Sequence, residues 1–244
     1  MTTAIPTIAA SSVPALTREQ MVEVDRLMIE VYGIQLIQMM ENAGLQLARL
    51  ARYLAEPSAQ PVVVVIAGRG NNGGGGLAAA RRLSAWGADV TVVLADEPAA
   101  FEGVPRQQLD ILRQMRVTMN TWDQALPSCV VLVDALIGYG LTGSPRGVAA
   151  DIIAAINASD AKVVSLDVPS GLDVDLAEAP ALAVRAAATL TLALPKVGLL
   201  DPGASPFVGE LYLADISVPP SLYQRMGLGT PSPFAGGQLV RLAG

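Results

Sequence analysis

The 244-residue sequence contains no histidine. A Ser-His-Asp or Cys-His catalytic centre and a histidine-ligated metal are therefore excluded within this chain. Any acid–base catalysis has to use Asp, Glu, Lys, Tyr, Arg or water. Any bound cation is expected to have oxygen ligands.

Cysteine is almost as scarce. Cys129 is the single cysteine, so no intramolecular disulfide can form. It opens an apolar run, which favours a buried structural thiol over a nucleophile. The lack of disulfides fits a reducing compartment, and we expect a cytoplasmic location.

Charged residues make up only 16% of the sequence, and the net charge is −6. No Lys/Arg cluster is present that would neutralise a phosphate backbone, so we expect no nucleic-acid partner. The apolar runs are broken by Gly, Pro or charge and fall short of the roughly 20 residues that a membrane helix needs. Residues 1–13 lack the basic and apolar parts of a signal peptide. The sequence therefore predicts a soluble globular protein without a membrane partner.

Two helices are predicted before the first strand. Thr17 and Gln20 have the spacing of a capping box, and apolar residues follow at helical spacing up to Gly33. The second helix is predicted over residues 35–54. We interpret its methionines as core filling.

From residue 61 onward, predicted strands alternate with predicted helices. The strands are predicted at residues 61–67, 90–94, 130–133, 163–166, 189–193 and 210–216, and the helices at 74–86, around 109–115 and at 148–156. This alternation predicts a Rossmann-like three-layer α/β/α sandwich, with a mostly parallel sheet and helices on both faces. We expect one domain over residues 16–227, a flexible tail over 1–15 and an appendage over 228–244.

A glycine-rich segment, residues 68–76, joins the first strand to the next helix. Glycines permit positive φ angles and let a phosphate approach the backbone. Free N–H groups at a helix start also favour an anion. Because this glycine density is costly without a close ligand, we predict phosphate binding here rather than only a flexible turn.

The same segment matches the G-x-G-x-x-G dinucleotide fingerprint, with Asp96 and Glu97 after the next strand. An NAD-dependent oxidoreductase is therefore an alternative function. Two helices precede the motif, however, and the paired Asn71 and Asn72 are more polar than a plain glycine turn requires.

Two further strand ends carry aspartates. Asp134 follows the third strand and leads into a segment whose glycines and hydroxyls can hold a second phosphate. Asp167 follows the fourth strand, with Ser170 in the turn behind it. Ligands of doubly wound sheets bind beyond the carboxyl ends of the strands, so we expect these three side chains to converge.

Lys196 follows the strand predicted at residues 189–193, in a chain with few lysines. A lysine at a strand end can meet a phosphate or assist proton transfer. A solvated loop lysine is the alternative interpretation.

Five segments in this order resemble the NAD(P)H-hydrate epimerase family, of the YjeF amino-terminal type. The segments are Met40-Glu41-Asn42-Ala43-Gly44, Gly70-Asn71-Asn72-Gly73-Gly74, Asp134-Ala135-Leu136-Ile137-Gly138, Asp167-Val168-Pro169-Ser170-Gly171 and Pro195-Lys196. The family epimerises the hydrated C6 of damaged NADH or NADPH. The resemblance implies NAD(P)H hydrate as substrate, a potassium ion as cofactor, a separate ADP- or ATP-dependent dehydratase as partner, and a homodimer.

The resemblance also implies roles for individual residues. Substrate contacts are implied for Asn71, Asn72, Gly73, Gly74, Gly75 and Asp167, and phosphate contacts for Gly138, Tyr139, Gly140, Leu141, Thr142, Gly143 and Ser144. The implied potassium ligands are Asn72, Asp134 and Ser170. Asp167 is our candidate acid–base group, and Lys196 is the second candidate.

The glycine segment departs from the family pattern at one position. The family usually reads N-N-G-G-D-G, whereas this sequence has Gly75 where Asp is expected. The loss of that carboxylate leaves a non-catalytic nucleotide-binding or scaffold module as the main alternative to an epimerase.

Overall fold

The computed structural model describes residues 4–141, 143–175 and 182–244. In these parts of the chain nine strands form one sheet, in the order β1-β9-β8-β7-β6-β5-β2-β3-β4. The strands are β1 Thr7–Ala9, β2 Val62–Ala67, β3 Asp89–Leu94, β4 Thr118–Thr121, β5 Val131–Ala135, β6 Lys162–Leu166, β7 Ala188–Leu192, β8 Glu210–Ala214 and β9 Leu239–Ala243. All neighbours are parallel except β8 and β9, which pair antiparallel.

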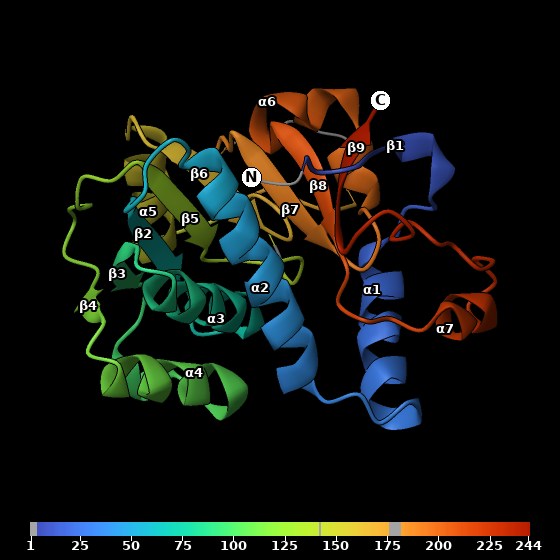
Figure 1. Ribbon diagram of the computed structural model, residues 1–244, viewed down its shortest axis with the longest axis horizontal. Coiled ribbons are helices and arrows are strands. Elements are labelled where there is room, and N and C mark those ends of the chain that lie inside the picture. The colour runs from blue at the N-terminus through green and yellow to red at the C-terminus, as the bar shows by residue number, and fades with distance from the viewer. Residues whose placement is uncertain (1–3, 142, 176–181) are drawn as a thin grey trace.

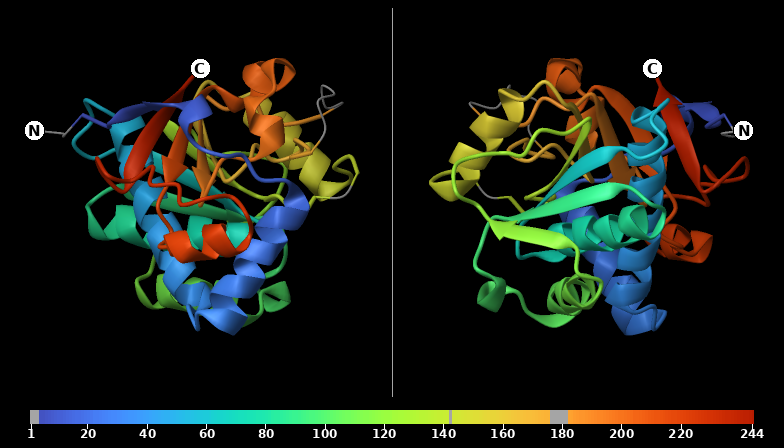
Figure 2. Two further views of the ribbon diagram at one scale, coloured as in Figure 1. Left: turned by 90° about the vertical axis from the view of Figure 1, so that its right-hand side faces the viewer. Right: turned by 60° about the vertical axis from the view of Figure 1, so that its left-hand side comes forward.

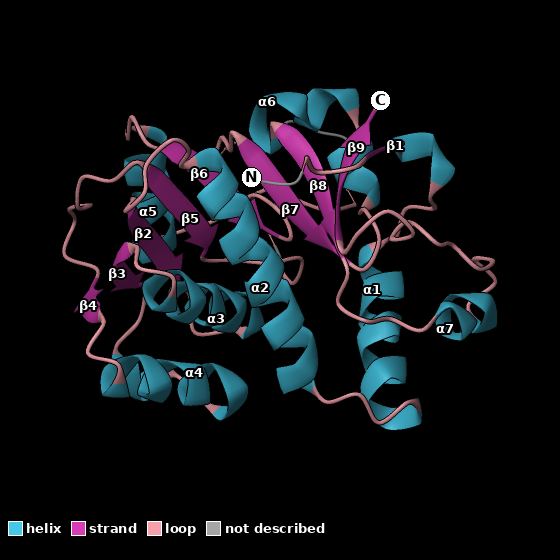
Figure 3. Ribbon diagram, in the orientation of Figure 1, coloured by secondary structure: helices cyan, strands magenta, loops and turns pink. Residues whose placement is uncertain are grey.

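Helices cover both faces of this sheet (Figure 1; Figure 3). The helices are α1 Arg18–Arg26, α2 Leu36–Leu54, α3 Asn71–Ala85, α4 Gly103–Gln114, α5 Val148–Asn157, α6 Ser205–Val208 and α7 Pro220–Arg225. Helix α1 continues into a π-helical turn, Leu27–Val31, and short 3-10 turns lie at Ala10–Ser12, Pro98–Ala100, Val197–Leu200 and Pro202–Ala204. Helices α2, α3 and α4 lie on one face, and α5 lies on the other (Figure 1).

The alternation of side chains along β2 explains the layers. Val63, Val65 and Ala67 pack in the same core as α2, α3 and α4. Val64 and Ile66 pack with α5 on the opposite face. Because successive strand residues point to opposite faces, an unbroken apolar strand has to be covered twice. The predicted three-layer sandwich is confirmed.

The early helices also follow the prediction. Thr17 accepts a hydrogen bond from the backbone N–H of Gln20, whose side chain accepts one from the Thr17 N–H. Gly33 has a positive φ of 69° just beyond the helical segment, a conformation that glycine adopts without strain. Helix α3 differs from the prediction, because it begins at Asn71 rather than at residue 74.

Both chain ends contribute strands that the sequence analysis did not anticipate. β1 pairs parallel with β9, which in turn pairs with β8 (Figure 2). Residues 7–9 and 239–243 are thus parts of the sheet rather than a tail and an appendage. Leu239, Val240 and Leu242 are buried and Arg241 is exposed, so this strand is short but has one apolar face.

The strand order reverses between β2 and β5. The chain runs from β2 to β3 and β4 on one side, then crosses to β5 and continues through β6, β7 and β8 on the other. In open parallel sheets such a reversal leaves a crevice at the carboxyl ends of the two strands, where ligands bind. No helix among the described residues is long and apolar enough to cross a membrane.

Candidate functional site

The glycine-rich segment forms the first turns of helix α3, directly after β2. Gly70 is the N-cap, with a φ of −83°, and offers no side chain to cap the helix. The first backbone N–H groups of a helix have no partner within it. The positive end of the helix dipole lies at the same place. The helix start therefore has the geometry of an anion site, and phosphate binding here stays a prediction.

The glycines of this helix serve close packing rather than unusual backbone angles. Gly70 and the four glycines after Asn72 all keep φ out of the positive range. A Cβ on Gly73 would lie 1.7 Å from the Gly68 carbonyl oxygen, and one on Gly76 would lie 2.5 Å from the Ala135 Cβ. Our expectation that positive φ angles explain these glycines is wrong, because α3 needs them to approach the strand ends.

Asp134 lies one residue before the end of β5 and is a fully buried hydrogen-bond acceptor. Its carboxylate accepts hydrogen bonds from the hydroxyls of Ser165 and Ser170 at 2.7 and 2.6 Å, and from the backbone N–H groups of Ser170 and Leu136 at 2.9 and 3.3 Å. Burial raises the pKa of Asp134, and these hydrogen bonds offset part of that rise. The predicted convergence of Asp134 and Ser170 is present, and it joins the loops that follow β5 and β6.

Asp167 and Lys196 form a buried ion pair. The ammonium of Lys196 also donates to the Thr191 hydroxyl at 3.2 Å and to the Leu192 carbonyl at 2.9 Å. Lys196 has no exposed surface, so it is not a solvated loop lysine. Asp167 has a φ of 66°, a left-handed conformation that is uncommon for a residue with a side chain and often marks a functional site. The two candidate catalytic side chains thus contact each other.

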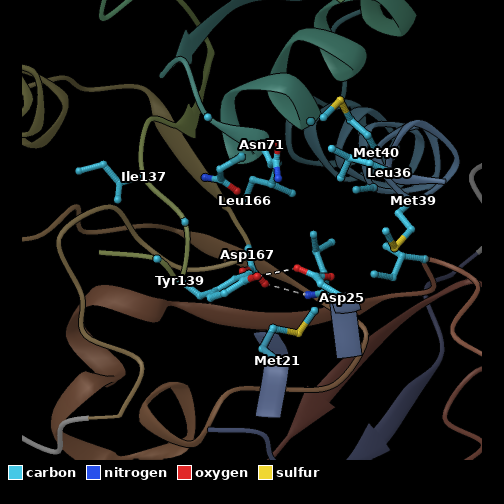
Figure 4. A pocket seen from close by; sticks show the side chains of 18 of the residues that line it. Met21, Asp25, Leu36, Met39, Met40, Asn71, Ile137, Tyr139, Leu166 and Asp167 are labelled. Carbon is cyan, nitrogen blue, oxygen red and sulfur yellow. Dashed lines mark hydrogen bonds between the residues drawn. The ribbon is translucent and has the colours of Figure 1, made fainter. Parts of the chain in front are cut away.

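A pocket of about 380 Å³ opens at the carboxyl ends of β2, β5, β6 and β7. Its walls come from the start of α3, the loop after β5, Asp167, and helices α1 and α2. Figure 4 shows Asp25, Tyr139 and Asp167 together at one wall, while Leu36, Met39 and Met40 come from α2. The pocket lies in the crevice that the strand order predicts, and it combines an apolar wall with a polar one.

Asp25 is a pocket residue that the sequence analysis missed. It lies half-buried on α1, and the Tyr139 hydroxyl donates a hydrogen bond to its Oδ2 at 2.5 Å. Burial raises the pKa of Asp25; the nearby Asp167 carboxylate adds to the rise, while the hydrogen bond from Tyr139 and the charge of Lys196 oppose it. A signal was available, because Asp25 lies four residues after buried Met21 and three before buried Met28, on the face that packs inward.

Contacts with two strand-end loops place α1 beside the pocket. Leu16 forms a parallel bridge with Lys196, through a backbone hydrogen bond of 2.8 Å to the Pro195 carbonyl. Arg18, at the first position of α1, pairs with Asp173 at 2.7 Å and with Asp175 at 3.2 Å. These two aspartates hold α1 in place and do not line the pocket.

Residues 36–198 match the family described as YjeF-related protein N-terminus. The chain belongs to this family. It is 41% identical to the NAD(P)H-hydrate epimerase of Dehalogenimonas lykanthroporepellens, over 97% of this chain and 96% of that protein. It is 43% identical to the NAD(P)H-hydrate epimerase of Truepera radiovictrix, over 84% of this chain and 91% of that protein.

A longer relative and a solved structure complete the comparison. The chain is 38% identical to the bifunctional NAD(P)H-hydrate repair enzyme Nnr of Thermofilum pendens, over 82% of this chain but only 39% of that enzyme. The crystal structure of the yeast protein ynu0 has a TM-score of 0.80 at 23% identity and covers 94% of this chain and 100% of its own. That likeness shows a shared fold.

The family's Met40–Gly44 segment holds α2 against α3 and α4. Glu41 pairs with both Arg81 and Arg82, and it accepts a hydrogen bond from the Gln108 side chain at 2.8 Å. Burial opposes ionisation of Glu41, but the hydrogen bond from Gln108 and the two arginines outweigh it, so the pKa of Glu41 is lowered. A Cβ on Gly44 would lie 2.6 Å from the Ala78 Cβ, so glycine is needed where α2 and α3 touch.

The predicted site residues divide into two groups. Those that line the pocket are Asn71, Asn72, Gly75, Gly138, Tyr139, Gly140 and Asp167. Those that are described but do not line it are Gly73, Gly74, Asp134, Leu141, Gly143, Ser144, Ser170 and Lys196. Thr142 lies outside the described residues. Gly143 and Ser144 are exposed, and their predicted role at a phosphate stays a prediction.

The geometry disfavours the dinucleotide fingerprint. In that interpretation an acidic residue after the next strand faces the ligand. Asp96 and Glu97 follow β3 at the expected place, but neither lines the pocket. The pocket walls come instead from the side of β5 and β6.

Proposed function

We propose that this protein epimerises the R and S forms of NAD(P)H hydrate, without redox chemistry. The observation that carries the proposal is the pocket itself: it places a helix start suited to phosphate within reach of the buried Asp167–Lys196 pair. The relatives named NAD(P)H-hydrate epimerase are similar to the chain over almost its whole length.

The reaction needs two things from the protein. The nucleotide has to be held so that C6 of the damaged ring meets a proton carrier, and water has to be controlled around it. In our proposal the α3 start and the loop of Gly138 and Gly140 hold the phosphates. Leu36, Met39 and Met40 give the ring an apolar wall. Asp167, in its ion pair with Lys196, faces C6 as the acid–base group.

A potassium ion is part of the proposal, held by Asn72, Asp134 and Ser170. The Asn72 side-chain nitrogen is buried and has no hydrogen-bond partner among the described residues. Rotation of the amide would present its oxygen to a cation instead, so this residue fits an oxygen-ligand site. Asp134 already accepts four hydrogen bonds, two on each carboxylate oxygen. Beside an ion, its carboxylate would balance the positive charge. The ion would supply positive charge beside a bound phosphate.

The proposal extends to partners and location. Epimerisation alone does not restore the cofactor, so a separate ADP- or ATP-dependent NAD(P)H-hydrate dehydratase would consume one product. A homodimer and a cytoplasmic location are also proposed. Gel filtration and cell fractionation test these two points.

The test is a chromatographic assay of epimer exchange, starting from one purified hydrate epimer, in potassium and in sodium buffers. We expect exchange by the wild type, faster with potassium, and a rate about 10²–10⁴-fold lower for Asp167→Asn with nucleotide binding largely kept. Binding without exchange in either buffer would favour a non-catalytic module. Absorbance changes of NADH with an oxidisable substrate would favour an oxidoreductase.

A further inference from the structure

Asp25 and Tyr139 form a second polar pair in the pocket wall, beside the Asp167–Lys196 ion pair. The Tyr139 hydroxyl binds Asp25 Oδ2 at 2.5 Å, and both side chains line the cavity that also holds Asp167 (Figure 4). The two residues come from α1 and from the loop after β5, which the chain brings together across more than 100 positions. Two carboxyl groups, Asp25 and Asp167, thus face one small cavity.

The two carboxyl groups have different surroundings. Asp167 is in an ion pair with the buried ammonium of Lys196. Asp25 has no cation in contact among the described residues; its hydrogen-bond partner is the neutral Tyr139 hydroxyl. Two like groups in different environments commonly divide the roles of proton donor and negative charge between them.

We propose that Asp25 is the proton donor to the hydroxyl on C6 of the hydrated nicotinamide ring, and that Tyr139 is its positioning residue. This rests on the proposed epimerase function. Asp25 donates its proton to the C6 hydroxyl oxygen, the C6–O bond breaks, and a water molecule leaves. The lone pair of the ring nitrogen N1 forms the C6=N1 bond, which makes C6 planar. Asp25 rather than Asp167 is then the proton donor, and the Asp167 carboxylate on the same wall stabilises the resulting positive charge.

The return step restores every atom. Water adds to C6 from either face, the electrons of the C6=N1 bond return to N1, and the Asp25 carboxylate takes the extra proton. No oxidant or reductant is needed, and water is the single co-reactant. Because C6 is no longer a stereocentre in the planar intermediate, addition of water to its two faces gives both epimers.

The groups around Asp25 determine how this step depends on pH. The titratable groups that face it from neighbouring elements are Tyr139, Asp167 and Lys196. Burial raises the pKa of Asp25, and the hydrogen bond from Tyr139 lowers it in part by stabilising the carboxylate. If protonated Asp25 is the donor, kcat has to fall as the pH rises through this pKa. Loss of the Tyr139 hydroxyl then has to move that fall to higher pH.

The first test is Asp25→Asn, which keeps the size and an oxygen acceptor for Tyr139. We expect kcat for epimer exchange to fall about 10²-fold or more, with nucleotide binding nearly unchanged and the alkaline fall in kcat abolished. Glu23→Gln is the matched control, because Glu23 lies on the same helix and pairs with Arg26 at the surface. It should exchange at the wild-type rate.

The second test is Tyr139→Phe, with Tyr212→Phe as control. The Tyr212 hydroxyl donates to Glu210 at 2.7 Å, so the control also removes a tyrosine–carboxylate bond, but on β8 and outside the pocket. We expect the alkaline fall of kcat to shift to higher pH in Tyr139→Phe alone. A residue with a merely structural role would lower the amount of folded protein without moving the pH profile.

Failure of this inference differs from failure of the proposed function. A wild type without exchange would remove the function, and the inference with it. A wild type that exchanges, together with a folded Asp25→Asn that keeps its kcat and pH profile, would overturn only the role of Asp25. An unshifted profile in folded Tyr139→Phe would overturn the positioning role. Solvent ¹⁸O that fails to enter C6 during exchange would overturn the step through loss of water.

Discussion

Replacing Lys196 by Met removes one partner of the buried pair and leaves the other. Lys196 has no exposed surface, and the Asp167 side chain is only 5% exposed. Among the described residues, the variant would leave the Asp167 carboxylate with two donors, the backbone N–H of Leu192 at 3.3 Å and the Thr191 hydroxyl at 3.5 Å. These are long hydrogen bonds for a charged acceptor, whose partners are normally closer than 3 Å.

The uncompensated charge of Asp167 determines how much stability the Lys196→Met variant loses. Breaking a buried ion pair by removing one partner costs about 3–5 kcal/mol of unfolding free energy. For a chain of this size each kcal/mol lowers Tm by about 2–4 °C, so we expect a loss of about 6–20 °C. Asp110→Asn is the control: Asp110 forms exposed ion pairs with Arg106 and Arg113, whose loss should hardly change the stability.

A double-mutant cycle separates the pair from its parts. Lys196→Met, Asp167→Asn and the double variant are unfolded in urea, and the three losses in free energy are compared. The double variant contains neither charge, so it should be more stable than Lys196→Met, with a coupling free energy of about 2 kcal/mol or more. A loss of unfolding free energy in Lys196→Met no larger than that in Asp110→Asn would contradict this expectation. A double variant whose loss equals the sum of the two single losses would also contradict it.

Three further changes probe the helices that carry the site. Glu41→Gln should lower the free energy of unfolding by about 1–3 kcal/mol. Because the pKa of Glu41 is lowered in the folded state, the stabilisation by its carboxylate is present above the unfolded pKa and is lost as the pH falls. Urea unfolding of wild type and variant should therefore show a smaller difference in stability at pH 3 than at pH 7. A Cβ on Gly70 would meet no atom within 4 Å, so Gly70→Val should fold while weakening calorimetric nucleotide binding at least about 10-fold, about 1.4 kcal/mol, whereas Gly73→Val should not fold. Gly75→Asp should displace the Leu166 side chain, 2.7 Å from the new Cβ, at a cost of about 1–3 kcal/mol, and should not exceed the wild-type exchange rate. A faster variant would mean that the missing carboxylate limits turnover.

Much of the fold could be predicted because the spacing of apolar residues along the sequence shows which faces of a helix or strand are buried. The apolar run around Val64 has no polar face, so it had to be a central strand covered on both sides. The convergence of Asp134 and Ser170 followed from the rule that parallel strands end at one edge. The edge strands β1 and β4 and the neighbouring strand β9 were missed because three to five residues give too short a pattern.

The polar wall of the pocket was harder to predict. Asp25 is one carboxylate among the many charges of an amphipathic helix, and its partner Tyr139 lies 114 residues away. No local rule links two such positions, because their contact depends on Leu16 and Arg18 holding α1 beside the strand ends. A charged residue on the buried face of α1 indicated an unusual position. Without the location of α1 in the fold, however, it could not be assigned to the site.

Gly75 shows why a sequence departure has to be interpreted together with its neighbours. Its missing side chain leaves space that the Leu166 side chain borders, directly before Asp167 in the chain. The pocket still contains two carboxyl groups, one in an ion pair with Lys196 and one hydrogen-bonded to Tyr139. The loss of one carboxylate from the α3 start therefore does not leave the cavity without proton carriers. A third carboxyl group in the same 380 Å³ would add like charge beside Asp25 and Asp167, which disfavours ionisation of all three. On this argument the glycine is compatible with an active enzyme, and the activity depends on the wall formed by α1 and the loops after β5 and β6.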